Sequence, residues 1–496
     1  MHLPTRPIVS GFHPDPTVCQ VDGTYYMAHS SFEYAPGLPL YRSTDLRTWE
    51  HLGHALDRPS QLSVSGAVAS GGVFAPTLRH HDGRFWLITT NLTEGGGHLL
   101  VTAEDPAGPW SDPVRFPDAP GIDPDLAWDD DGTCYLTWSG FGDQGPMGIV
   151  QAVVDPTTGK VLSEPRQLWQ GTGGKFPEGP HIYHIGDFWY QLIAEGGTER
   201  GHAVTIARGP SPAGPFEPCP WNPALTARGT DSPVQNAGHG DLVEGPDGQW
   251  TLVYHGVRPR GTSPEWHVLG RETFASQITW EDGWPRLGEP VEPSSPAVVT
   301  EELSSPHLPA SWCAPARFPA ESLRPAENGW RLAAAPKGEA VFAGRRQEHL
   351  YARIRAKVRA EDGQGGLELR IDPRHALRLE LTRGRVRAVA RVGSLVSVLG
   401  ETEIDGASDI TLALRIEPAR GHVFSTELGP DEIIATVSGA DGVVELGRVD
   451  GRYFSTEVAG GMTGRLIGVF CDRGDVIVRS FTYTGSDDPH ALDAVG

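Results

Sequence analysis

The segment HPDPTVCQVDGTYYMAHSS, residues 13–31, is the first of five similar stretches, and these repeats decide the fold. Each stretch has a Pro or Asp near its start, a few apolar residues, an Asp/Gly turn and an aromatic-rich run typical of a β-strand. The other four are FAPTLRHHDGRFWLITTN (74–91), IDPDLAWDDDGTCYLTWSG (122–140), EGPHIYHIGDFWYQLIAEGG (178–197) and HGDLVEGPDGQWTLVYHG (239–256). Three of the five open with a carboxylate: Asp15, Asp123 and Glu178. Carboxylates repeated at one structural level indicate a ring built around an acid/base site.

The spacing of the repeats favours a propeller. The repeated Pro lies at positions 16, 76, 124 and 180, and Asp241 replaces it in the last copy. Repeats about 50 to 60 residues apart, each with several short strands, fit propeller blades better than solenoid units. The segments STDLRTWEHLG, AEDPAGPWSDP and ARGPSPAGPFEPCP resemble the outer hairpins of blades. The alternative is a β-sandwich with coincidental Asp-Gly turns. We predict a five-bladed β-propeller.

Composition and pattern changes divide the chain into regions. The 62 Gly and 43 Pro residues, together with the absence of long helical periodicity, indicate an all-β protein. We predict a propeller over 1–291 and a Pro/Ser-rich linker over 292–311. Strands alternating between apolar and polar residues then predict an antiparallel β-sandwich over 312–485, of the jelly-roll or concanavalin-like type. Residues 486–496 form a short polar tail in this scheme.

Charge and cysteine content limit the partners and the cell compartment that we expect. The 41 Lys and Arg against 63 Asp and Glu give a net charge of −22, which disfavours nucleic acid and membrane surfaces as partners. The N-terminal residues contain no apolar signal core, so we expect a cytoplasmic protein; a homo-oligomer is compatible with the sequence. The cysteines are odd in number and never paired as CxxC, which indicates reduced core residues: Cys19, Cys134, Cys219, Cys313 and Cys471.

The motifs within the repeats resemble glycoside hydrolase family 43. They are GFHPDP (11–16), SSFEYAPGLPLYRSTDL (30–46), SGGVFAPTLR (70–79), IDPDL (122–126), EGPHIY (178–183), AEGGTERGHAV (194–204) and GRETF (270–274). Residues 452–471 also resemble the accessory sandwich of the family's xylosidase-like branch. The resemblance implies a five-bladed propeller that cleaves pentose-containing glycans by inversion. It covers most of the chain.

Three carboxylates carry the expected chemistry. An inverting glycosidase uses one carboxylate as general base on water and a second as proton donor to the leaving oxygen, roughly 6.5–9.5 Å apart. By resemblance Asp15 is the base, Glu178 is the acid and Asp123 tunes the pKa of Glu178 and orients it. Asp125 departs from the family pattern, and strand alternation would point it to the same side as Asp123. The sequence leaves the role of Asp125 open.

Further residues are expected to bind the substrate. Arg271 resembles the family's sugar-binding arginine, whereas a solvated strand arginine is the alternative. Phe32 and Phe74 are expected to form walls against a pentose ring, although isolated aromatic residues more often belong to a core. Thr198 and His202 are candidates for the leaving-group side, and a packed turn explains them nearly as well.

No cofactor is required for this chemistry. His239 heads the fifth repeat where other repeats place acids, and in relatives the matching histidine lies beneath the site near the propeller axis. It is a candidate ligand for a water or a calcium ion near that axis. A purely structural, hydrogen-bonding histidine explains it equally well.

Three classes of function are compatible with the repeats. The favoured class is an exo-acting glycosidase that removes terminal β-D-xylose, or α-L-arabinofuranose, from short oligosaccharides of xylan degradation. A main activity as α-L-arabinofuranosidase is the alternative. A non-catalytic carbohydrate-binding propeller and a structural propeller leave the acid constellation unexplained. We further expect the segment at Tyr453 and Phe454 to help close the pocket; packing of both rings in the sandwich core is the alternative.

Overall fold

The computed structural model describes residues 3–94, 97–142, 147–294, 296–303, 306–335, 339–360, 362–405, 408–421, 428–439 and 442–494. Within these ranges the chain is almost entirely β, and it forms two compact units. One unit consists of residues 1–9, 13–257 and 271–295, and the other of residues 10–12, 258–270 and 296–496. No described helix has the length and apolar character that crossing a membrane requires.

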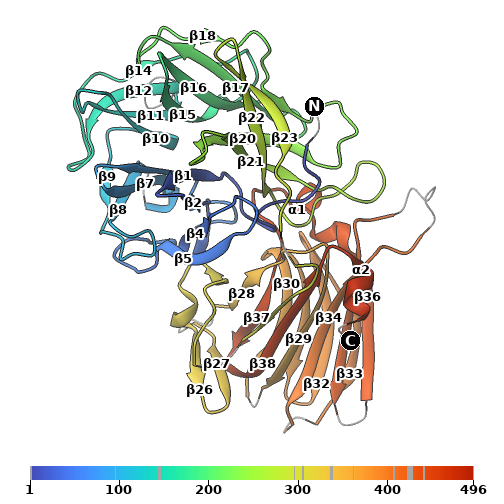
Figure 1. Cartoon of the computed structure of the whole chain (residues 1–496). Coiled ribbons are helices and arrows are strands. Elements are labelled where there is room, and N and C mark those ends of the chain that lie inside the picture. The colour runs from blue at the N-terminus through green and yellow to red at the C-terminus, as the bar shows by residue number, and fades with distance from the viewer. Residues whose placement is uncertain are drawn as a thin grey trace. The chain divides into compact units, whose positions relative to one another are not determined.

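The first unit is a five-bladed propeller, as predicted (Figure 1). Blade 1 contains β1 (Thr17–Val21), β2 (Thr24–Ala28), β4 (Gly37–Ser43) and β5 (Glu50–Leu56); the short β3 (Tyr34–Ala35) follows β2 in the chain but is not part of this sheet. Blade 2 contains β6 (Thr77–His81), β7 (Arg84–Thr90), β8 (His98–Ala103) and β9 (Val114–Phe116), with η1 (Leu92–Glu94) after β7. Blade 3 contains β10 (Ile122–Trp128), β11 (Cys134–Phe141), β12 (Met147–Asp155) and β13 (Lys160–Val161), and β14 (Arg166–Gln167) also pairs with β12.

The last two blades repeat this antiparallel order. Blade 4 contains β15 (Glu178–Ile185), β16 (Phe188–Glu195), β17 (Ala203–Gly209) and β18 (Glu217–Pro218), and β19 (Leu225–Thr226) also pairs with β17. Blade 5 contains β20 (Gln235–Glu244), β21 (Trp250–Val257), β22 (Glu272–Glu281) and β23 (Trp284–Pro290). The innermost strands β1, β6, β10, β15 and β20 each contact the next in turn, and β20 contacts β1, so the ring closes. The residues that head the sequence repeats therefore lie around one axis.

The Asp-Gly turns form the hairpins that the sequence predicted. Asp22 and Gly23 join β1 to β2 with φ of 49° and 80°, and Asp82 and Gly83 join β6 to β7 with φ of 50° and 70°. Two successive residues with positive φ match the twist of antiparallel strands, and Asp-Gly adopts this conformation at low cost.

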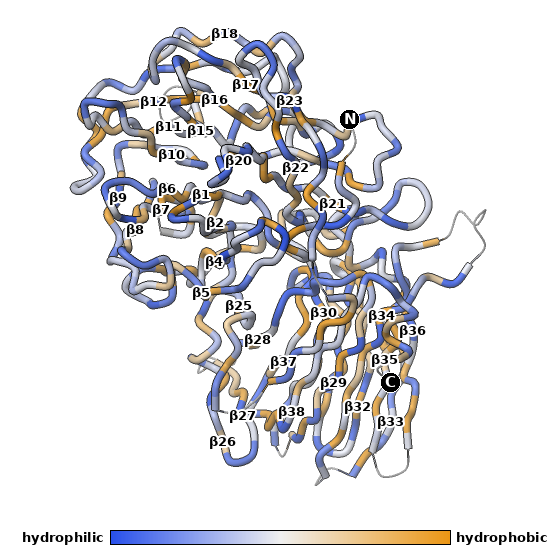
Figure 2. The backbone as a smooth tube through the Cα atoms, viewed as in Figure 1, coloured by the Kyte–Doolittle hydropathy of each residue, from blue (hydrophilic) through white to orange (hydrophobic). Residues whose placement is uncertain are grey.

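The C-terminal region of the second unit folds into antiparallel sheets. One sheet has the order β26 (Leu323–Ala326), β27 (Gly329–Ala333), β38 (Asp475–Ser486), β29 (Tyr351–Arg359), β34 (Ile410–Glu417), β35 (Glu432–Gly439) and β36 (Gly442–Asp450), with β24 (Val299–Glu302) also on β38. The other runs through β25 (Trp312–Pro315), β28 (Val341–Arg346), β37 (Leu466–Arg473), β30 (Gln364–Asp372), β31 (His375–Thr382), β32 (Arg385–Val392) and β33 (Leu395–Glu403). Alternate residues of facing strands, such as Leu367 and Leu412, are buried in one core, which confirms the predicted sandwich (Figure 2).

Short helices and one long connection complete the second unit. The helices are η2 (Pro319–Glu321), η3 (Gly451–Phe454), α1 (Thr456–Ala459) and α2 (Pro489–Asp493), the last within the predicted tail. Residues 258–270, which connect β21 to β22 in the chain, pack in this unit. Phe454 is fully buried in the sandwich core, whereas the Tyr453 side chain is 43% exposed. Core packing, the alternative given for this segment, therefore holds for Phe454 and not for Tyr453, and closure of the pocket by this segment stays a prediction.

Candidate active site

The predicted acids lie where the innermost strands begin, at irregular backbone. Asp15 precedes β1, Asp123 and Glu178 open β10 and β15, and the register of β10 and of β15 shifts just after each. Asp15 and Asp123 both have φ of 55°, and Gly179 has φ of 57°. β-Bulges of this kind re-aim a side chain out of the ordinary alternation of a strand. A positive φ thus lies at or next to each acid, and Asp123 and Glu178 also lie at a register shift.

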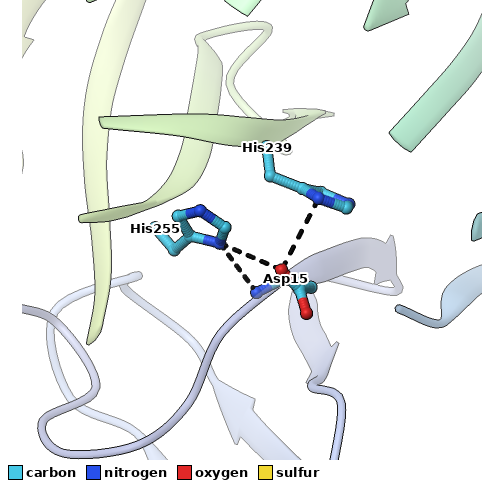
Figure 3. A group of neighbouring side chains, drawn as sticks. All are labelled: Asp15, His239 and His255. Atoms are coloured by element: carbon cyan, nitrogen blue, oxygen red, sulfur yellow. Dashed lines mark hydrogen bonds and ion pairs between the residues drawn. The ribbon is translucent and has the colours of Figure 1, made fainter. Parts of the chain in front are cut away.

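Asp15 is buried and bound on several sides (Figure 3). The Arg271 guanidinium donates from Nη1 to Asp15 Oδ1 at 2.6 Å, and the Ser30 hydroxyl donates to Oδ2 at 2.5 Å. The His255 Nδ1 accepts from the Asp15 backbone N–H at 3.1 Å and lies 3.1 Å from Oδ1. The His239 Nδ1 lies 3.5 Å from the same oxygen. One carboxylate is thus fixed by groups from blades 1 and 5.

These contacts keep Asp15 ionised. Burial by itself would raise the pKa of Asp15, but opposing interactions, of which the charge of Arg271 is the largest, hold that pKa well below its usual value. Burial also holds the pKa of His255 well below its usual value and lowers that of His239 to about 4. Both rings are therefore neutral near pH 7, and Arg271 is the cation beside Asp15.

Glu178 and Asp123 form a carboxyl pair whose pKa values are raised, in contrast to that of Asp15. The Gly179 backbone N–H donates to Asp123 Oδ2 at 3.1 Å, so Asp123 holds the bulge next to Glu178. Burial, followed by the charge of Asp15, raises the pKa of Glu178 to about 7. Burial, followed by the charges of Glu178 and Asp15, raises the pKa of Asp123 well above its usual value. Glu178 nevertheless keeps part of its surface accessible, as a proton donor to a bound molecule requires.

Asp125 has different partners from Asp123, although the two lie two residues apart. Its Oδ1 accepts from Arg79 Nη2 at 2.7 Å, and its Oδ2 accepts from the Ile182 backbone N–H at 2.8 Å. The register shift between Ile122 and Asp125 breaks the alternation on which the sequence argument relied. Asp125 is completely buried.

The two predicted aromatic residues contact each other. The rings of Phe32 and Phe74 pack edge to face with centroids 5.1 Å apart, and the Arg271 guanidinium lies over Phe32, 5.7 Å from its centroid. Phe32 is buried, while Phe74 is partly exposed. Phe74 thus offers accessible aromatic surface next to Phe32, the ring that Arg271 covers.

The two residues expected on the leaving-group side lie in different environments. Thr198 is partly exposed, and its backbone carbonyl accepts from the Asn236 side chain at 3.1 Å. His202 is fully buried, with its Nδ1 3.2 Å from the Asn236 carbonyl oxygen and 3.3 Å from His255 Nε2. His202 therefore supports the ring that contacts Asp15, and burial lowers its pKa to about 3.

Asp15, His239 and His255 place potential metal-ligand atoms within 4.8 Å of one another. Calcium prefers six to eight oxygen ligands, whereas this group offers two imidazole nitrogens and one carboxylate. The carboxylate oxygen nearest both rings already accepts from Arg271. This donor set does not fit the calcium ion that the sequence suggested at His239.

Sequence reasoning missed Ser30 and His255, although a signal was present. Both lie at the end of the aromatic run of a repeat, Ser30 in the first copy and His255 in the fifth. Because these runs are the second strands of the blades, their last residues return to the end of the blade where the acids lie. Polar residues at the ends of both strands could therefore have been sought together.

Comparison with known proteins decides the family. The model of the glycosyl hydrolases family 43 matches residues 4–285. This chain belongs to glycoside hydrolase family 43. It is 38% identical over 501 residues, covering 94% of this chain and 90% of the relative, to the non-reducing end alpha-L-arabinofuranosidase BoGH43B of Bacteroides ovatus.

Two solved structures resemble the family 43 chain over nearly its whole length. The Bacteroides ovatus protein described as xyloglucan PUL GH43B matches with a TM-score of 0.86 and 32% identity, covering 96% of this chain and 99% of that one. A xylan beta-1,4-xylosidase from Bacillus halodurans matches with a TM-score of 0.86 and 27% identity, covering 97% and 100%. The protein is a glycosidase of the xylosidase and arabinofuranosidase group.

Proposed function

We propose that this enzyme removes terminal pentose residues from short xylan-derived oligosaccharides by an exo-acting, inverting mechanism. Asp15 is the general base, Glu178 is the general acid, and Asp123 adjusts the pKa of Glu178 and orients it. The observation that carries the proposal is the opposite environment of two carboxyl groups. Arg271 keeps Asp15 ionised, whereas burial and the charge of Asp15 raise the pKa of Glu178 to about 7.

In this mechanism, side chains of the protein carry out both proton transfers. Ionised Asp15 takes a proton from the attacking water while Glu178 gives its proton to the leaving oxygen. Ser30 and Arg271 hold the carboxylate in place through hydrogen bonds to different oxygens. The Phe74 ring provides apolar surface for the sugar. The products are a free pentose of inverted anomeric configuration and the shortened oligosaccharide.

The sugar at the non-reducing end is β-D-xylose or α-L-arabinofuranose. The name of the Bacteroides ovatus relative, similar over nearly the whole chain, supports α-L-arabinofuranose, and the xylosidase name of the Bacillus halodurans structure supports β-D-xylose. We therefore propose that the enzyme acts on one or both of these pentosides, with the arabinofuranoside as the first substrate to test.

Matched aryl glycosides test the proposal. We expect hydrolysis of p-nitrophenyl α-L-arabinofuranoside or p-nitrophenyl β-D-xyloside, and the ratio of the two kcat/KM values gives the preference. Asp15→Asn should lose activity by a factor on the order of 10³, because general base catalysis is removed. A protein that binds the pentosides without cleaving either one would instead be a carbohydrate-binding propeller.

A further inference from the structure

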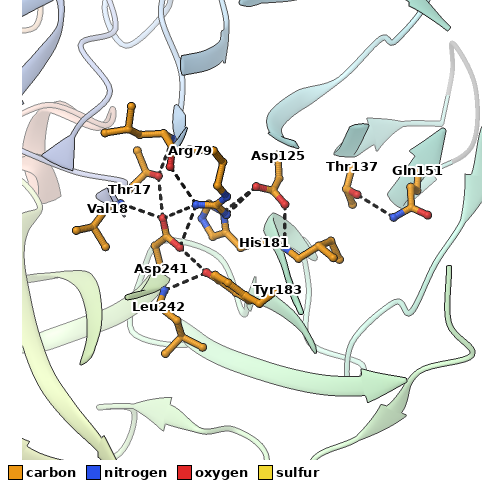
Figure 4. Close-up of polar contacts among 12 residues, drawn as sticks. Thr17, Val18, Arg79, Asp125, Thr137, Gln151, His181, Tyr183, Asp241 and Leu242 are labelled. Carbon is orange, nitrogen blue, oxygen red and sulfur yellow. Dashed lines mark hydrogen bonds and ion pairs between the residues drawn. The ribbon is translucent and has the colours of Figure 1, made fainter. Parts of the chain in front are cut away.

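A buried polar network at the propeller axis joins side chains from all five innermost strands (Figure 4). Its members are Thr17 of β1, Arg79 of β6, Asp125 of β10, His181 and Tyr183 of β15, and Asp241 of β20. The side chains of Asp125 and Asp241 are completely buried, and that of Arg79 is 16% exposed. The mechanism described above uses none of these residues.

Arg79 is the centre of the network. Its Nη2 donates to Asp125 Oδ1 at 2.7 Å and lies 3.0 Å from His181 Nδ1, and its Nη1 donates to Asp241 Oδ2 at 3.2 Å. A planar guanidinium can hold several partners in fixed directions, which a lysine ammonium cannot do. Buried charges are tolerated only when they are paired and hydrogen-bonded, and here one cation lies between two anions.

The second carboxylate receives additional donors. The Thr17 hydroxyl donates to Asp241 Oδ2 at 2.8 Å and the Val18 backbone N–H donates to it at 3.0 Å. The Tyr183 hydroxyl donates to Asp241 Oδ1. Burial opposes ionisation, but Arg79, His181 and these donors lower the pKa of Asp241 to about 2. Asp241 is thus ionised near neutral pH, and its charge is paired with that of Arg79.

Three consecutive residues of β15 are bound by this network. His181 contacts Arg79 of blade 2, the Ile182 backbone N–H donates to Asp125 of blade 3, and Tyr183 donates to Asp241 of blade 5. The Leu242 backbone N–H also donates to the Tyr183 hydroxyl at 3.0 Å. These three residues come immediately after the register shift between Glu178 and His181. The strand that carries Glu178 is therefore fixed at its most irregular point by three other blades.

Both sides of this bulge are held by the same innermost strand. Asp123 accepts from the Gly179 N–H on one side, and Asp125 accepts from the Ile182 N–H on the other. We propose that Asp125, held in place by Arg79, is a positioning residue that aims Glu178 at the leaving oxygen. The inference rests on the proposed role of Glu178 as general acid. In this inference, the two aspartates of the Asp-Pro-Asp sequence of β10 hold the backbone of β15 at two points near Glu178.

Comparing kcat/KM on substrates with poor and good leaving groups distinguishes a role of Asp125 in positioning Glu178 from a role in overall stability. A misplaced acid matters for a disaccharide, whose leaving oxygen needs a proton, and matters little for an aryl glycoside with a good leaving group. We expect Asp125→Ala to lower kcat/KM on xylobiose, or on the arabinosyl equivalent, on the order of tenfold to a hundredfold. The p-nitrophenyl glycoside should be cleaved nearly as fast as by the unchanged enzyme. Asp125→Asn, which keeps an oxygen for the Ile182 N–H, should show a smaller loss of the same kind.

Thr137→Val is the matched control. Thr137 lies opposite Asp125 on the neighbouring strand β11, is fully buried, and accepts from Gln151 Nε2 at 3.1 Å (Figure 4). Its hydroxyl bonds a residue of β12 in the same blade, so its loss tests the cost of removing a buried hydrogen bond. We expect a lower melting temperature and an unchanged ratio of the two kcat/KM values.

Glu178→Ala is the reference for the proposed function. If it loses most activity on the disaccharide only, while Asp125→Ala loses both activities equally or neither, the positioning role is wrong. If Glu178→Ala itself loses both activities equally, the acid assignment fails instead. If Asp125→Ala does not fold, the two kcat/KM values are compared in Asp125→Asn and Arg79→Lys instead. Failure of all three to fold would overturn the inference, since the network would then serve folding alone.

Discussion

At the scale of single residues, the site separates two carboxyl groups that would otherwise titrate together. Asp15 has a cationic partner and hydrogen-bond donors, which stabilise its charged form. Glu178 has burial and a neighbouring anion, which stabilise its neutral form. The resulting difference between the two pKa values allows one group to act as base and the other as acid at the same pH.

The two acids should respond differently to the leaving group. Glu178→Ala should lose little activity on a p-nitrophenyl pentoside, because the phenolate leaves without a proton, and much activity on xylobiose or its arabinosyl equivalent. Asp15→Ala should fail on both, because water still needs deprotonation. Steady-state kinetics on both substrates measures this, and early NMR spectra should show the inverted anomer. Retention, or an active Asp15→Ala variant on the aryl substrate, would mean that these roles are wrong.

Asp123 should set the basic limb of the pH–rate profile. The pKa of Glu178 is raised to about 7, so activity on a disaccharide should fall as pH rises through that value and the acid loses its proton. The Asp123 and Glu178 pair releases its last proton at higher pH than a lone carboxyl does, because the second charge forms beside the first. Asp123→Asn should therefore shift the basic limb to lower pH. A profile of kcat/KM that stays in place, or moves to higher pH, would contradict this coupling.

At the scale of elements, the sequence repeats predicted the blades, their hairpins and the strand end that carries the acids. They could not predict the β-bulges, because a bulge depends on the register between two strands and leaves no fixed pattern in either one. The consequence is clearest at Asp125, for which strand alternation suggested the same direction as Asp123. The register shift after Ile122 instead gives the two residues different partners.

The bulge at Gly179 offers a direct test of this element. A Cβ at Gly179 would lie 2.8 Å from the His239 ring, and the φ of 57° disfavours any other residue. We expect Gly179→Ala to displace the backbone next to Glu178 and to lower kcat/KM on a disaccharide on the order of a hundredfold.

Gly186→Ala is the control for backbone strain at this bulge. Gly186 lies in the turn between β15 and β16 with φ of 60°, and nothing lies within 4 Å of an added Cβ. This variant should lose about 1 kcal/mol of stability and keep its kinetics. Equal losses of kcat/KM in both variants would show that backbone strain in blade 4, rather than a clash with His239, lowers the activity.

At the scale of the whole molecule, the sequence predicted two folds in succession, but it did not predict that two segments of the propeller sequence belong to the second unit. Residues 10–12 and 258–270 lie within or before the propeller sequence and yet belong to the second unit. Their partners are distant in the chain: Asp431 binds Arg260, and Glu457 binds His267. Such pairings depend on tertiary packing, so no local pattern in the sequence predicts them.

Residues 258–270, which precede Arg271 in the chain, are held by contacts within the second unit. The Arg465 backbone N–H donates to the Val268 carbonyl at 3.0 Å, and the Glu457 carboxylate accepts from both the backbone N–H and the ring of His267. Arg271 follows this segment directly in the chain and binds Asp15. A chain ending near Val291 would leave residues 258–270 without these partners. We therefore expect it to have a lower kcat/KM on aryl and disaccharide substrates alike, and faster hydrogen exchange in residues 258–270.

A single substitution tests the same connection without removing a domain. Glu457→Gln weakens the contact with His267, so it should lower kcat/KM in the same direction by a smaller factor. Glu445→Gln is its control, because Glu445 is an exposed residue that pairs with Arg448 on the same strand. Exposed pairs of this kind contribute about 0 to 1 kcal/mol, so the control should behave like the unchanged enzyme. A truncated chain that stays folded with unchanged kcat/KM would show that the propeller positions Arg271 on its own.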